Sequence, residues 1–151
     1  MPELFSSADF EGVAGKGRLV DAFAYQDLVG NNLALAQRLA EIAKVHEYQE
    51  GQELYRQGEP GKGYLYFILS GEFDLLDKDN RIATLGSGQV VGEFPILEPS
   101  SNYYVTSRAR GNSVVALVSA GQFESIATEE YPELWRNMAK MIARRLRERT
   151  T

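Results

Sequence analysis

The sequence predicts an α+β protein in which N-terminal and C-terminal helices flank an antiparallel, jelly-roll-like β-roll. Apolar residues recur at helical spacing before residue 49 and again after residue 118. The stretch between consists of short apolar runs separated by glycines and other turn residues. Strand-length runs rich in Val, Ile, Tyr and Phe, at roughly even spacing, are typical of an antiparallel roll or barrel. We therefore expect a single domain.

The first third of the chain is predicted to be helical. Residues 1–17 contain three glycines and little periodicity, so we expect a loose lead-in there. Within 18–48, apolar residues return every three or four positions in two runs. Gly30 is suited to end the first helix, and Asn31 or Asn32 to cap the second. Both helices have an apolar face that needs a partner surface.

Residues 49–118 are predicted to form the roll. The segment Asp77–Asn80 carries the signal of a hairpin turn. The run at 64–69 is apolar almost throughout, so we expect both of its faces to be covered. The expected strands are the apolar runs at 53–56, 64–69, 73–76, 81–85, 90–91, 103–110 and 113–118.

Residues 119–151 are predicted to be helical again. Ser119 can cap a helix over 120–128, and Pro132 suits the first turn of a last helix. Cations near a helix C-terminus complement its dipole, so we interpret the basic cluster Arg144–Arg149 as a solvated face. The last helix also carries an apolar stripe that is suited either to dock on the roll or to pair with a second copy of the chain: Trp135, Met138, Ile142 and Leu146.

The composition excludes several classes of function. The net charge of −5 over 151 residues gives no general attraction to nucleic acid or to acidic membranes. The absence of cysteine excludes disulfides and thiolate metal sites. His46 is the single histidine, which argues against a cupin-like metal enzyme, and we place it at a helix-to-strand junction. Without a signal sequence or a membrane-length apolar run, we expect a cytoplasmic protein that is not an enzyme.

The glycine-punctuated stretch resembles the cyclic nucleotide-binding domain family, to which the catabolite activator protein and the regulatory subunits of protein kinase A belong. The resemblance covers about residues 33–149. It implies a β-roll with flanking helices and, in sensory members, a last helix that moves when ligand is captured. The segments that carry it, in the family's order and spacing, are Glu50–Gly61, Tyr64–Phe73, Ile82–Glu93, Gly121–Phe123 and Tyr131–Leu134.

The family's phosphate-binding cassette falls on residues 91–107, called the cassette below. The resemblance implies that Gly92 lets the backbone approach the ligand and that Glu93 accepts a hydrogen bond from the ribose 2′-hydroxyl. It also implies that backbone N–H groups at the start of a short helix face the cyclic phosphate. The candidate ligand-binding residues are Gly92, Glu93, Phe94, Ile96, Asn102, Tyr103 and Tyr104.

The cassette departs from the family pattern at the phosphate. The family's arginine falls on Asn102 or Tyr103, and residues 92–107 contain no lysine or arginine. Pro95 stands where a backbone N–H would meet the phosphate, and proline has none. A hydrogen bond to a charged group is worth ~1.5–3 kcal/mol, so losing two weakens binding by about two to four orders of magnitude.

Two interpretations follow. The first is a stand-alone sensory or regulatory domain in signal transduction with weakened or altered binding of cAMP, cGMP or another small ligand. In it Arg108 or Arg110 supplies the cation, and Tyr103 and Tyr104 stack on the base. The second is a degenerate domain for protein contacts, whose pocket these tyrosines plug. A protein partner is expected, and a homodimer through the last helix is a hypothesis from the resemblance. Neither nucleic acid nor a membrane is expected.

Overall fold

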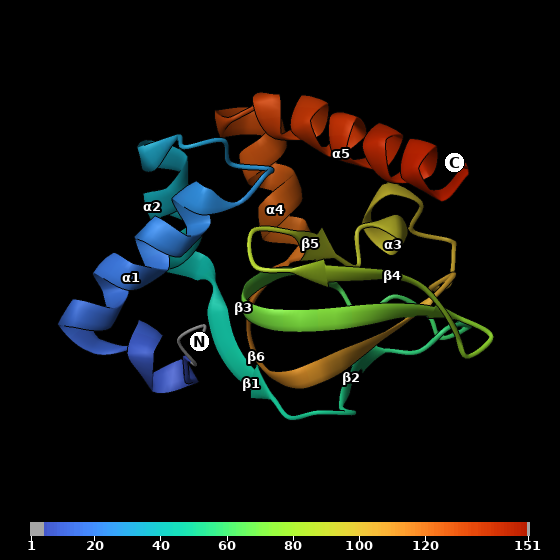
Figure 1. Ribbon diagram of the computed structural model, residues 1–151. Coiled ribbons are helices and arrows are strands. Elements are labelled where there is room, and N and C mark those ends of the chain that lie inside the picture. Colours follow the sequence, from blue (N-terminus) through green and yellow to red (C-terminus); the bar gives the residue numbers. More distant parts are fainter. Residues whose placement is uncertain (1–4, 151) are drawn as a thin grey trace.

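The computed structural model describes residues 5–150, with side chains up to Glu148, in the order of helices, roll and helices (Figure 1). This arrangement confirms the predicted fold class. The strands are β1 (Lys44–Tyr48), β2 (Glu53–Tyr55), β3 (Tyr64–Asp77), β4 (Asn80–Gly86), β5 (Val90–Val91) and β6 (Thr106–Ser119). The helical elements are η1 (Ser7–Phe10), α1 (Gly12–Tyr25), α2 (Leu33–Ile42), α3 (Phe94–Leu97), α4 (Ala120–Ser125), the π-helical turn η2 (Ile126–Glu130) and α5 (Glu133–Thr150).

The N-terminal helices begin earlier and end earlier than the sequence predicts. Helix α1 starts at Gly12, within the expected lead-in, of which residues 1–4 lie outside the described residues. A glycine is needed in its first turns because a Cβ at Gly15 would lie 2.5 Å from the carbonyl carbon of Phe10. Gly15 therefore reflects close packing of α1 on η1 rather than a loose segment.

The predicted helical segment 18–48 is too long at its C-terminal end. Helix α2 is capped as expected, since the Asn32 side chain accepts a hydrogen bond from Leu35 N at 3.1 Å, but it ends at Ile42. The next residues form β1, which pairs antiparallel with β6, and exposed His46 lies opposite Val115. Pairing with a distant strand decides this conformation, and local periodicity does not reveal it.

The sheet is organised around two long strands, β3 and β6. They pair antiparallel from Tyr64↔Ser119 to Leu76↔Thr106, in a sheet of order β1-β6-β3-β4 with β2 on β6 and β5 on β3. The predicted runs at 64–69 and 73–76 are therefore one strand, with register shifts around Gly71. The β3–β4 hairpin turns where predicted, with Lys78 and Asp79 at φ 50° and 68°.

Strand β3 separates two apolar cores, which confirms that both faces of the 64–69 run are covered. Leu65, Phe67 and Leu69 face the helices and pack in a cluster with residues of α1, α2, α4 and α5. Tyr66 and Ile68 face the interior of the roll and pack with aromatic and aliphatic residues of β2, β6 and the cassette. Because successive side chains of a strand point to opposite faces, alternate residues of this run pack in the two cores.

The C-terminal helices pack on the roll. Ser119 caps α4 as predicted, since its hydroxyl accepts a hydrogen bond from Gln122 N at 3.2 Å. Helix α5 crosses above the roll, and its C-terminal end lies above α3 (Figure 1). Its apolar stripe docks within the domain: Met138 is buried and Trp135 packs edge-on against Phe123, whereas Leu146 is 63% exposed. Among the described residues, no helix has the length and apolar character needed to cross a membrane.

We expect Gly71→Ala to lower the free energy of unfolding by about 2–4 kcal/mol, because left-handed strain and overpacking add. Gly71 has φ +88°, and a Cβ there would lie 2.7 Å from the carbonyl oxygen of Asn112. Urea denaturation measures the change. Gly121→Ala is the matched control, since a Cβ there meets nothing within 4 Å and alanine favours helix α4. Equal stability of the two variants would contradict the close approach of Gly71 to the backbone of Asn112.

Candidate functional site

The cassette lies at the end of the roll that α5 covers (Figure 1). It starts at β5, turns at Gly92 with φ +86°, and continues into α3. A Cβ at position 92 would lie 2.8 Å from the ring of Tyr66, so both the backbone conformation and the close approach require glycine. Pro95 sits in the first turn of α3, where its ring packs against Gly61.

Five of the seven candidate residues surround one small cavity. Gly92, Glu93, Phe94, Tyr103 and Tyr104 line it, together with Tyr55, Leu75, Val91, Val105 and Arg145. The space inside is about 10 Å³, which is room for about one water molecule and for no larger ligand. The other two candidates do not line this cavity: Ile96 lines a neighbouring groove that also borders Gly92 and Tyr103, and Asn102 forms an isolated bridge with Pro60.

Tyr103 fills the interior of the roll at this end. Its side chain is 3% exposed, and its ring stacks on Tyr55 with centroids 3.9 Å apart and an interplanar angle of 11°. Its hydroxyl accepts a hydrogen bond from Lys62 N at 3.0 Å, and its backbone N–H donates to the carbonyl of Glu59 at 2.9 Å. Hydrogen bonds at the hydroxyl and at the backbone therefore fix the Tyr103 ring inside the roll.

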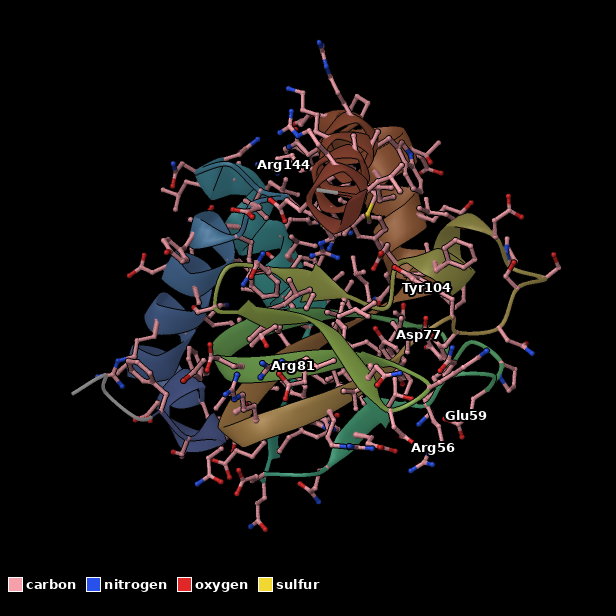
Figure 2. All side chains as sticks on the ribbon, turned by 45° about the vertical axis from the view of Figure 1, so that its right-hand side comes forward. Arg56, Glu59, Asp77, Arg81, Tyr104 and Arg144 are labelled. Carbon is pink, nitrogen blue, oxygen red and sulfur yellow. The ribbon has the colours of Figure 1, made fainter. Side chains whose placement is uncertain are left out.

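Tyr104 has a different environment from its neighbour. It is 41% exposed and packs on Phe94 with ring centroids 5.0 Å apart. Figure 2 shows it beside α3 and below α5. Both rings line the cavity and both are partly exposed, so together they form an apolar rim at its edge.

A single cation and a single anion meet at the cavity. Glu93 is 6% exposed, and Arg145 reaches it from α5 with Nη1 at 3.7 Å from Oε1. The second guanidinium nitrogen of Arg145 donates to the carbonyl of Val90 at 2.6 Å. Among the residues described, Arg145 is the one cation that lines the cavity, and it joins the cassette to the last helix.

The sequence pattern groups Arg145 with the basic cluster Arg144–Arg149, so its place at the cavity is not predicted. A signal was present: position 145 follows Met141 by four and Met138 by seven, so it lies on the buried face of α5. Arg144 instead lines an open groove with Asp27 and lies beside α5 on the side towards α2 (Figure 2). Adjacent arginines thus have opposite environments.

The two arginines that the sequence offered as phosphate partners do not reach the cavity. Arg108 Nη2 lies 2.9 Å from Glu53 Oε2, and Arg110 Nη1 lies 3.9 Å from Asp74 Oδ1. Both side chains point to the outer face of β6, because residues alternate along a strand and Ala109 between them points into the roll. The expectation that either would supply the cation is therefore wrong.

Burial raises the pKa of tyrosines in and behind the cavity wall. Desolvation raises the pKa of Tyr55 well above its usual value, and the negative charge of Glu93 adds to the effect. Desolvation also raises the pKa of Tyr66 and of Tyr103, although the hydrogen bond from Lys62 N opposes the rise at Tyr103. These hydroxyls are neutral at physiological pH. Within residues 5–150, no group of three or more His, Cys, Asp or Glu side chains could hold a metal ion.

The sequence of this chain is similar to those of bacterial effector proteins. The chain is 36% identical over 140 residues to the Pycsar effector protein PaPycTIR of Pseudomonas aeruginosa. The aligned region covers 93% of this chain and 45% of that protein. It is 35% identical over 140 residues to BcPycTIR of Burkholderia cepacia, with 93% and 46% covered. The chain thus spans about half the length of these relatives.

The fold and the sequence both lead to one family. A crystal structure of a cyclic nucleotide-binding domain from Methylobacillus flagellatus superposes with a TM-score of 0.74 at 16% identity, over 97% of this chain and 93% of that one. That likeness shows the fold. The family model described as "Cyclic nucleotide-binding domain" matches residues 45–130, which include β2 to β6, all of β1 but its first residue, and the whole cassette. The chain belongs to the cyclic nucleotide-binding domain family.

Proposed function

We propose that the chain is the ligand-sensing regulatory domain of a signal-transduction protein, and that a cyclic nucleotide binds beside Glu93 with weakened or altered affinity. The observation that carries the proposal is the ion pair between Glu93 and Arg145. It connects the family's ribose-binding carboxylate to the last helix. The relatives named as effector proteins support a signalling role.

Arg145 replaces the missing cassette arginine in this proposal. The Arg145–Glu93 pair is buried, with side chains 18% and 8% exposed, so it separates only where a phosphate takes the guanidinium and a hydroxyl takes the carboxylate. A hydrogen bond from a guanidinium to a phosphate is worth about 1.5–3 kcal/mol. An entering phosphate therefore draws the guanidinium away from Glu93 and frees the carboxylate to accept the ribose hydroxyl. Since Arg145 belongs to α5, this exchange changes how α5 is held.

The closed cavity lowers the apparent affinity. With about 10 Å³ of free space, the site admits no nucleotide until Tyr103 or α5 moves. A ligand that binds only the open form has its affinity reduced by the fraction of molecules that are open. Pro95, which lacks an N–H for the phosphate, weakens binding further. Together these features support weak rather than tight binding of cAMP.

A second candidate function is a protein-interaction module whose site takes no nucleotide. The observation that favours it is the Tyr55–Tyr103 stack, which occupies the roll interior and is tied to the loop before β3. A protein partner belongs to both candidates. A homodimer through α5 stays a hypothesis, and Leu146 is the exposed member of the stripe that it would use.

Calorimetric titration of the purified chain with cAMP and cGMP separates the two candidates. We expect binding of cAMP with a dissociation constant no tighter than micromolar, and faster amide hydrogen exchange in α5 on binding. Submicromolar binding of cAMP would contradict the weakened site. A lack of binding by both nucleotides, with α5 unchanged, would favour the protein-interaction module.

We expect Arg145→Gln to weaken nucleotide binding by about tenfold to a hundredfold, because a phosphate contact worth about 1.5–3 kcal/mol is lost. The matched control is Arg144→Gln, which removes the same charge from the neighbouring position outside the cavity. Binding that is unchanged or tighter in Arg145→Gln would mean that Arg145 only holds the site closed.

The buried tyrosines predict a fall in stability at alkaline pH. Because the pKa of Tyr55 is raised in the folded state, its contribution is fully present below the unfolded pKa of about 10 and is lost as pH rises further. We expect Tyr55→Phe to flatten the decline of the free energy of unfolding above pH 10, by up to about 1.4 kcal/mol per pH unit. Urea midpoints from pH 8 to 11 measure this. Parallel curves for the variant and the parent would show that the Tyr55 hydroxyl is reached by water.

A further inference from the structure

We infer that Ser107 is a specificity-determining residue whose hydroxyl hydrogen-bonds the polar edge of the bound base. This inference rests on the proposed function and deepens it, since it names the part of the ligand that the floor of the roll would recognise. Ser107 lies on β6, within the cassette, and is separate from the residues that the family resemblance singled out.

The Ser107 hydroxyl is buried without a partner. The residue is 0% exposed, and among the residues that the structure describes its Oγ has no hydrogen-bond partner. Buried hydroxyls are nearly always paired, and an unpaired one destabilises the fold. Gln26 Oε1 is also unpaired, but the amide nitrogen of the same side chain donates to the carbonyl of Ile68 at 2.9 Å and thereby has a structural role. The side chain of Ser107 makes no such hydrogen bond to a described residue.

The sheet register aims this hydroxyl into the roll below the cavity. Ser107 lies directly opposite Tyr55 on β2 and Leu75 on β3. Directly opposite residues of antiparallel strands place their side chains on the same face. Both partners line the cavity, and Ala109, two residues further along β6, also belongs to the core inside the roll. The hydroxyl is therefore part of the floor beneath the tyrosine stack.

A ligand base can reach this floor once Tyr103 leaves the ring of Tyr55. The vacated space is flat and bounded by an aromatic face, which suits a stacked heterocycle. The edge of that heterocycle then faces Leu75, Val105 and Ser107. A serine hydroxyl both donates and accepts, so it can pair with a base carbonyl, a ring nitrogen or an exocyclic amine. A ligand with an apolar edge would leave it unpaired, which gives the site a preference for a base.

The test compares Ser107→Ala with Ser113→Ala, a buried serine of the same strand whose hydroxyl is bonded. Ser113 is 1% exposed, and its Oγ accepts from Glu72 N at 3.2 Å and donates to Glu72 O at 3.3 Å. We expect Ser107→Ala to keep or raise the Tm of the unliganded protein, because it removes an unpaired polar atom. We expect Ser113→Ala to lower the Tm, because it leaves backbone groups unpaired.

The binding arm uses calorimetry with cAMP, cGMP, cCMP and cUMP. We expect the nucleotide that the parent binds most tightly to lose about tenfold in affinity with Ser107→Ala and to be unaffected by Ser113→Ala. Equal binding by Ser107→Ala and the parent would overturn the role of Ser107 while the proposed function stood. A Tm loss in Ser107→Ala like that of Ser113→Ala would also overturn it, since the hydroxyl would then have a structural partner. Failure of the parent to bind any of the four would overturn both proposals.

Discussion

The antiparallel pairing of β3 with β6 is the constraint on which the rest of the structure depends. The two strands pair along their full length and divide their side chains between the core under the helices and the core inside the roll. Every other strand pairs with one of these two. The cassette connects to the start of β6, so the register of this pair also fixes where Tyr103 and Ser107 lie relative to Tyr55. Site geometry is thus a consequence of one long-range pairing.

The site combines a retained turn with altered charge placement. Gly92 keeps the backbone conformation that brings Glu93 inward, while the positive charge comes from α5 rather than from the cassette itself. Under the proposed function, a cation on α5 differs physically from one in the cassette, because α5 is a separate element that packs on the site. Its contribution depends on where the helix lies, so ligand affinity and helix position become linked quantities. The same two residues would then serve recognition and response.

The parts of the fold that depend on local chemistry could be predicted from the sequence. Asn32 and Ser119 act as caps, and the turn at Lys78–Asp79 lies where its residues indicate. The misplaced elements depend on distant partners. Strand β1 exists because β6 is beside it, and α1 needs a glycine at position 15 because η1 packs against it. In the site, the cassette residues could be placed from their order, but Arg145 lies some fifty positions away and is brought in by packing of α5.

Under the proposed function, Tyr103 in the Tyr55–Tyr103 stack acts as a tethered competitor of the ligand. Its ring is covalently part of the chain and competes at an effective concentration that dilution does not change, so it raises the ligand concentration needed for half-occupancy by a fixed factor. That factor can be tuned by residues that never touch the ligand, such as those around Lys62, whose backbone N–H holds the Tyr103 hydroxyl. Evolution could therefore set the sensitivity of such a domain independently of its selectivity, by strengthening or loosening the ring's own anchorage.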